Sequence, residues 1–118
     1  MKTSRAYFGY RNDDGTLDVE RIDVQGSEEP GYGNLRITYG FLPPRLDLRP
    51  YSPSGYDCVG RGAAQLALAI LADLLDDDAK ALKLHGKFES DVITHLPHEH
   101  NWTLEATDVR KWLAEHDH

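Results

Sequence analysis

Residues 60–75 have the sequence GRGAAQLALAILADLL. Between Ala63 and Leu75 only Gln65 and Asp73 are polar, and leucine and alanine have high intrinsic helix propensity. A helix that is apolar almost all the way round has to be enclosed by other elements. We therefore predict that this segment is a buried central helix and that the rest of the chain packs around it.

Three segments before this helix have the composition of β-strands. Residues 5–10 are rich in aromatic side chains, and Asn12-Asp13-Asp14-Gly15 follows them as a hairpin turn. Residues 17–24 alternate in part, and a change of phase at Arg21-Ile22 suggests a β-bulge. Residues 35–39 alternate between apolar and polar side chains and form a third predicted strand.

The segments on either side of the central helix complete the predicted order of elements. Residues 45–49 follow Pro43-Pro44 and are predicted to be extended. Asp76-Asp77-Asp78 is predicted to separate the central helix from a second helix that Pro97 stops. The apolar face of this second helix is Leu84, Phe88, Val92 and Leu96. A third helix is predicted from Thr103, as its N-cap, to about Glu115, and its apolar face is Val109, Trp112 and Leu113.

This pattern predicts an α+β fold in which a small antiparallel sheet of three to four strands precedes a three-helix unit with a buried central helix. The length of 118 residues suits a single domain over residues 1–118, with residues 1–50 mostly β and residues 63–116 helical.

Composition limits the classes of protein to which the chain can belong. Hydrophobic residues make up 40% and charged residues 28% of the chain, as in globular proteins. The longest apolar run, residues 66–72, is too short to span a membrane, and the polar N-terminus does not resemble a signal peptide. The single cysteine, Cys58, rules out an internal disulfide. We therefore expect a cytoplasmic protein.

The net charge of −7 is concentrated in the second half of the chain. Residues 63–118 carry eleven acidic and five basic side chains, which would repel nucleic-acid phosphates. The basic residues of the first half are mostly arginines, so a local anion site there stays open. The charge distribution therefore favours a protein partner over a nucleic acid.

The loop that leads into the central helix holds most of the candidate binding residues. Tyrosine and arginine are common in protein interfaces, and the free N–H groups at a helix start favour an anion. The polar Gln65 either braces the backbone of the Gly55–Gly62 loop or contacts a ligand directly. The candidate binding residues are Arg49, Tyr51, Ser52, Tyr56, Arg61 and Gln65.

Other reactive side chains do not form a recognisable catalytic set. His95, His98, Glu99 and His100 are possible metal ligands, but Pro97 breaks any helical spacing between the histidines, so we predict no metal site and no cofactor. Cys58 is predicted to be a buried, inert thiol, because its neighbour Asp57 would raise its pKa. We predict no catalytic residue and expect the protein not to be an enzyme.

Residues 42–113 resemble domain-of-unknown-function family 6166, which occurs in bacteria and phages. The resemblance rests on the turn Ser52-Pro53-Ser54-Gly55-Tyr56, the helix sequence Ala64-Gln65-Leu66-Ala67-Leu68-Ala69-Ile70-Leu71, and the later Trp102-Thr103-Leu104. Asp57-Cys58-Val59 stands where the family usually has a glycine-rich run containing tryptophan, and Ala63 replaces a proline. The resemblance implies a shared fold and a phage or mobile-element context but no activity.

The leading hypothesis is a non-enzymatic interaction module, such as an acidic phage or mobile-element accessory or inhibitor protein. The alternative is a sensor or small enzyme that binds a nucleotide or phosphate at the Gly60–Gln65 helix start. The sequence does not decide the oligomeric state.

Overall fold

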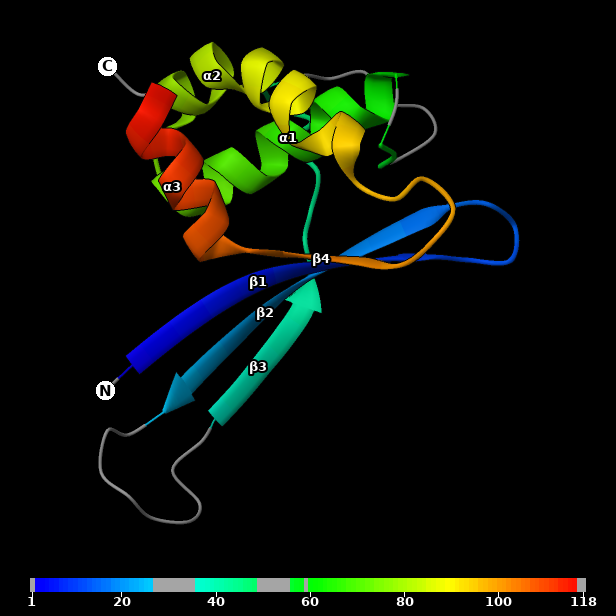
Figure 1. The fold of residues 1–118 in the computed structure, drawn as a ribbon, viewed down its shortest axis with the longest axis horizontal. Coiled ribbons are helices and arrows are strands. Elements are labelled where there is room, and N and C mark those ends of the chain that lie inside the picture. The colour runs from blue at the N-terminus through cyan, green and yellow to red at the C-terminus, as the bar shows by residue number, and fades with distance from the viewer. Residues whose placement is uncertain (1, 27–35, 49–55, 59, 117–118) are drawn as a thin grey trace.

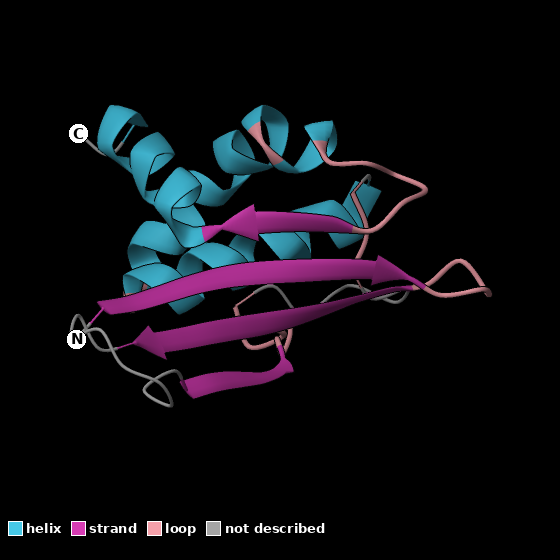
Figure 2. Ribbon diagram, turned by 60° about the horizontal axis from the view of Figure 1, so that its bottom comes forward, coloured by secondary structure: helices cyan, strands magenta, loops and turns pink. Residues whose placement is uncertain are grey.

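The computed structural model describes residues 2–26, 36–48, 56–58 and 60–116. Its elements are β1 (Lys2–Arg11), β2 (Leu17–Gly26), β3 (Arg36–Phe41), α1 (Gly60–Leu75), α2 (Asp78–Asp91), the 3₁₀-helix η1 (Ile93–His95), β4 (Trp102–Glu105) and α3 (Ala106–His116). The strands form one antiparallel sheet in the order β3-β2-β1-β4, and the helices lie on one face of it (Figures 1 and 2). This arrangement confirms the predicted α+β fold.

The helix α1 is the centre of the core, as predicted. Every residue from Gly62 to Ala72 is buried, including the polar Gln65. The sheet covers one side of α1, and α2 packs against it from the helical layer (Figure 1). None of the described helices combines the length and the apolarity that a membrane crossing requires.

The β1–β2 hairpin forms without the predicted bulge. Its turn is closed by the N–H of Asn12, which donates to the carbonyl of Thr16 at 2.8 Å, and Gly15 adopts a φ of +90° that favours glycine. Pairing is continuous through Tyr7 opposite Arg21 and Ala6 opposite Ile22, so the bulge prediction is wrong. The change of phase arises because Arg21 lies on the helix-facing side of the sheet, where a carboxylate of α1 binds it.

Two other local predictions are also wrong. Residues 46–48 form a turn rather than an extended segment, with the N–H of Leu48 donating to the carbonyl of Arg45 at 3.1 Å. The guanidinium of Arg45 binds the carboxylates of Asp47 and Asp78, which holds this turn against the start of α2. Residues 102–105 form the strand β4 rather than the start of a helix, so Thr103 is not an N-cap.

The strand β4 packs the indole of Trp102 against β1 at Gly9, where no side chain would fit. Gly9 lies opposite Trp102, and a Cβ atom at Gly9 would lie 2.3 Å from the indole ring. Trp102 and Leu104 are buried while Thr103 and Glu105 are exposed, which is the alternation of a half-buried strand. The helix α3 then begins at Ala106 and buries Val109, Trp112 and Leu113, the apolar face predicted for the last helix.

The junction between α1 and α2 follows the predicted cluster of acidic residues. Asp76 has a φ of +51° after the end of α1, and the carboxylate of Asp77 accepts from the N–H of Lys80 as the N-cap of α2. The helix α2 buries Leu84 and Phe88 as predicted. It ends at Asp91, earlier than the predicted stop at Pro97, and η1 follows.

Candidate functional site

The loop before α1 lies mostly outside the described residues. Arg49, Tyr51 and Ser52 belong to this part of the chain, and Arg61 falls in α1 but its side chain is also outside the description. The structure therefore tests only Tyr56 and Gln65 among the predicted binding residues.

Gln65 is a structural brace in the free chain. Its side chain is 0% exposed, and its Oε1 accepts from the backbone N–H of Arg45 at 2.7 Å. The amide therefore binds a backbone, as one of the two interpretations expected. The described partner belongs to the segment that follows β3, and the predicted bond to the Gly55–Gly62 loop falls largely outside the described residues. This bond fixes that segment against α1.

Tyr56 is part of the core. Its ring is 5% exposed, and its hydroxyl donates to the carbonyl of Leu42 at 2.8 Å. Its backbone pairs with Leu17, and its ring lies 6.3 Å from that of Phe41 between centroids. Tyr56 therefore supports the end of β3 and does not present its ring to a partner.

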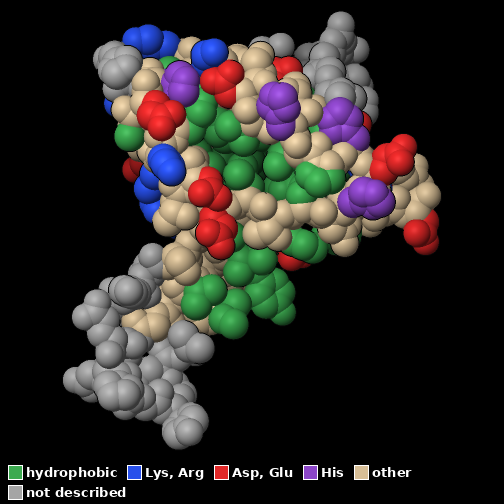
Figure 3. Space-filling model, in the orientation of Figure 1, with side chains coloured by type: hydrophobic (Ala, Val, Ile, Leu, Met, Phe, Trp, Pro, Cys, Tyr) green, Lys and Arg blue, Asp and Glu red, His purple; other side chains and the backbone are tan. Residues whose placement is uncertain are grey.

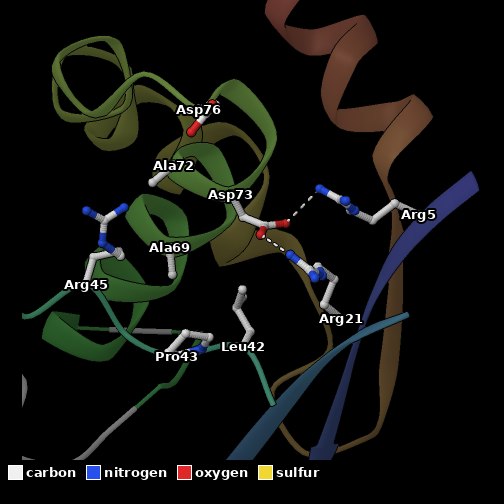
Figure 4. Close-up of a pocket in the computed structure, with 9 residues that line it drawn as sticks. All are labelled: Arg5, Arg21, Leu42, Pro43, Arg45, Ala69, Ala72, Asp73 and Asp76. Atoms are coloured by element: carbon white, nitrogen blue, oxygen red, sulfur yellow. Dashed lines mark hydrogen bonds and ion pairs between the residues drawn. The ribbon is translucent and has the colours of Figure 1, made fainter. Parts of the chain in front are cut away.

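A pocket of about 430 Å³ lies between the sheet and the last turns of α1 (Figure 4). Asp73 of α1 points toward the sheet and accepts from Arg21 Nη1 at 2.7 Å, Arg5 Nη1 at 3.3 Å and the Tyr7 hydroxyl at 2.6 Å. Asp23 binds the Nε atoms of the same two arginines, at 2.6 Å from Arg5 and 3.3 Å from Arg21. The lining residues are Arg5, Arg21, Leu42, Pro43, Arg45, Ala69, Ala72, Asp73 and Asp76.

The arginines that line this pocket are already paired with carboxylates. The hydrogen bond to Asp23 raises the pKa of Arg5. Burial and then the bond to Asp73 raise the pKa of Tyr7, so its hydroxyl stays protonated. Arg45, on the opposite wall, is bound by Asp47 and Asp78. An anionic ligand would have to displace these carboxylates, and we interpret the network as the anchor that joins α1 to the sheet.

A second, more open pocket of about 490 Å³ lies at the β1–β2 turn. Arg11 donates there to the carbonyl of Gly15 and to Asp57, while its Nε atom has no described partner. His98 Nε2 donates to the carbonyl of Thr94 at 3.0 Å. Within the described ranges no three His, Cys, Asp or Glu side chains lie close enough to hold a metal ion. Burial raises the pKa of the Cys58 thiol, which makes it a weak nucleophile.

The face of the sheet opposite the helices, here called the open face, is unusually apolar. Cross-strand partners place their side chains on the same face, and Tyr7, Arg21 and Leu104 point toward the helices. The residues that alternate with them therefore point away. The described side chains of the open face are Ser4, Ala6, Phe8, Tyr10, Asp18, Glu20, Ile22, Val24, Ile37, Tyr39, Phe41, Thr103 and Glu105.

The most exposed apolar part of this face lies on β3. Ile37 is 59% exposed, Tyr39 is 69% exposed and Phe41 is 59% exposed. Hydrophobic side chains gather on the sheet below the helices in Figure 3, where β3 lies in Figure 1. Sequence reasoning identified the alternation in this strand but did not nominate it as a binding surface, because alternation alone does not tell which face meets the core.

Comparison with known proteins identifies a family but no characterised relative. A family model described as a family of unknown function, DUF6166, matches residues 7–115. Searches of curated proteins and of solved structures gave no match. The family match covers both the sheet and the helices, beyond the residues on which the sequence resemblance rested. The chain therefore belongs to the DUF6166 family of unknown function.

Proposed function

We propose that this protein is a non-enzymatic interaction module that binds another protein through the open face of its sheet. One observation carries the proposal: Ile37, Tyr39 and Phe41 are each more than half exposed on one edge strand. Large apolar side chains clustered on a surface are typical of protein-binding sites. The fold offers a reason for their position, because the helices cover only the other face of the sheet (Figure 2).

The inner polar groups support a binding role rather than a catalytic one. The buried amide of Gln65 and the carboxylate of Asp73 are each used to join elements of the fold. No described observation adds a ligand-binding group to the start of α1, so we do not extend the anion-sensor alternative. The acidic composition and the family resemblance favour an accessory or inhibitor protein of a phage or mobile element as the narrower role.

Site-specific photocrosslinking tests this proposal. A benzophenone amino acid replaces Tyr39 in one variant and Lys111, an exposed residue of α3, in a matched control. After irradiation in the producing cell, we expect one discrete adduct with another protein from position 39 and none from position 111. The adduct should disappear when Ile37→Lys and Phe41→Lys are added.

Equal adducts from both positions, or an adduct that survives the two lysines, would contradict the proposal. An adduct formed only with a second copy of this chain would also contradict it. Circular dichroism and thermal unfolding of each variant verify that the fold is retained, so that a lost adduct reports the surface and not unfolding.

A further inference from the structure

We propose that the outer edge of β3 receives an extended, basic segment of the partner protein as a fifth strand of the sheet. This inference rests on the proposed function and specifies the chemistry of the partner. It starts from the position of β3, which ends the strand order β3-β2-β1-β4. No described segment pairs with the outer edge of β3.

The hydrogen-bond pattern shows which backbone groups of β3 face outward. The N–H of Leu42 donates to the carbonyl of Val19 at 2.9 Å, which continues the β2–β3 register by one position. In an antiparallel ladder, hydrogen-bonded and non-hydrogen-bonded pairs alternate along the strands. Residues 36, 38, 40 and 42 therefore bond to β2, and residues 37, 39 and 41 direct their N–H and C=O groups toward the outer edge.

The outward backbone groups and the exposed apolar side chains belong to the same residues. Ile37, Tyr39 and Phe41 offer three N–H and C=O pairs at the edge and three apolar side chains on the open face. An added strand uses both features, because its backbone completes the ladder while alternate side chains pack on the face. Edge strands that must stay free usually carry charges or proline; β3 has one charge, Arg36 at its first position, and its other residues, 37–41, have neither.

The charges on the open face near this edge favour a basic strand, whereas the cation of β3 itself, Arg36, points to the opposite face of the sheet. Glu20 lies opposite Phe41 on the open face, and no described cation forms an ion pair with it. A strand added beyond β3 lies two strand spacings, about 10 Å, from β2, so a long lysine or arginine side chain extends to within the Debye length of Glu20. The net charge of −7 also favours a basic segment over an acidic one. A second copy of the chain would bring the same negative charge.

Three synthetic eight-residue peptides with capped ends test the inference. The first alternates valine and lysine, the second replaces every lysine with glutamate, and the third carries an N-methyl group on every backbone amide of the first, so that neither of its edges can donate to β3. Amide exchange of the full chain is measured by nuclear magnetic resonance. Without peptide, we expect the amides of Ile37, Tyr39 and Phe41 to exchange faster than those of Thr38 and Gly40.

The lysine peptide should slow exchange at the amides of residues 37, 39 and 41 by a larger factor than at residues 38 and 40, which are already bonded to β2. The glutamate and N-methyl peptides should not. Tyr39→Lys should abolish the protection, whereas the matched control Leu82→Lys, on the exposed side of α2, should retain it. Glu20→Gln should reduce the preference for lysine over glutamate, and added salt should weaken lysine-peptide binding in the wild type.

Several results would overturn the inference. These are equal protection by the glutamate peptide, protection at residues 37, 39 and 41 that is no greater than in the rest of the chain, no protection by any peptide at millimolar concentration, and concentration-dependent protection without peptide, which indicates pairing with a second copy. A crosslink at position 39 together with no peptide protection leaves the proposed function standing and rejects strand addition. Protection with no crosslinked partner shows that the edge of β3 accepts a basic strand but rejects the proposed function, and with it the assignment of that strand to a partner protein.

Discussion

The contact between Gly9 and Trp102 predicts opposite effects for the same substitution at two glycines. A Cβ atom at Gly9 would lie 2.3 Å from Cε2 of Trp102, about 1 Å closer than an ordinary carbon contact. The indole is 5% exposed and held between the sheet and the helices, so it cannot swing into solvent. At Gly86, in the exposed middle of α2, an added Cβ meets nothing within 4 Å.

The expected magnitudes follow from these two environments. Overpacking a close-packed core costs about 1–3 kcal/mol, and we expect Gly9→Ala to fall in the upper half of this range because a rigid ring takes the clash. Gly86→Ala should stabilise the fold by about 0.5–1 kcal/mol, since alanine is the better helix former. For a domain of this size, 1 kcal/mol corresponds to a change of roughly 4 °C in Tm.

Urea unfolding followed by tryptophan fluorescence and circular dichroism measures both variants. The double variant Gly9→Ala/Trp102→Leu should be less destabilised than the sum of the two single variants, because the smaller side chain relieves the clash. A Gly9→Ala protein as stable as the wild type would refute the packing of β4 on β1. Additive effects in the double variant would place the cost of Gly9→Ala somewhere other than the indole.

Three further predictions concern the polar groups that join α1 to the rest of the fold. Because the pKa of the Tyr7 hydroxyl is raised in the folded state, the stability that this hydroxyl contributes should be complete below its unfolded pKa of about 10 and be lost as pH rises above that value. Tyr7→Phe should therefore flatten the fall in unfolding free energy that urea titrations measure between pH 9 and 11. An unchanged slope would count against this effect. Asp73→Ala should cost about 1–3 kcal/mol in urea unfolding, since the buried Tyr7 hydroxyl loses its acceptor and Arg5 and Arg21 keep only Asp23, and a loss below 0.5 kcal/mol would show that the network is not an anchor. Gln65→Leu should cost about 1–3 kcal/mol and speed amide exchange at Arg45, whose N–H loses its acceptor, so unchanged exchange at that amide would argue against the brace.

The central helix could be predicted from the sequence because its almost wholly apolar composition is compatible with only one environment, the protein core. A helix with apolar side chains from Ala63 to Leu75 can only be stable when enclosed, and α1 is enclosed. The strand β4 was missed for the opposite reason. Four residues, Trp102 to Glu105, are too few for periodicity to separate a strand from a helix start, and pairing with β1 decides the outcome.

The binding surface was harder to predict than the core. Sequence reasoning sought function in polar residues before α1, whereas the described Gln65 and Tyr56 are buried and serve the fold. Alternation in β3 correctly indicated a strand. Its apolar face could not be assigned to the core or the solvent until the register with β2 was known, because a shift of one residue exchanges the two faces.

The polarity of the two faces of the sheet gives a second argument that another surface covers the open face. Toward the ends of β1 and β2 near the N-terminus, the face that meets the helices carries charged side chains, Arg5, Arg21 and Asp23, which Asp73 helps to neutralise. The open face of the same strands carries Ile22 and other apolar side chains. An antiparallel sheet with one face permanently in water normally has polar side chains there.

At this end of the sheet the polarity of the two faces is the reverse of that rule, and the free-energy cost differs between them. Partly burying Arg5 and Arg21 requires the carboxylates of Asp23 and Asp73, whereas leaving apolar groups in water carries a cost that only a second surface removes. An apolar open face that continues onto the unpaired edge of β3 forms one surface for a partner to cover. Partner binding should therefore protect the amide of Tyr39 directly, while the amides inside α1, which exchange through global unfolding, should slow only by the common factor that follows from the stability gained on binding.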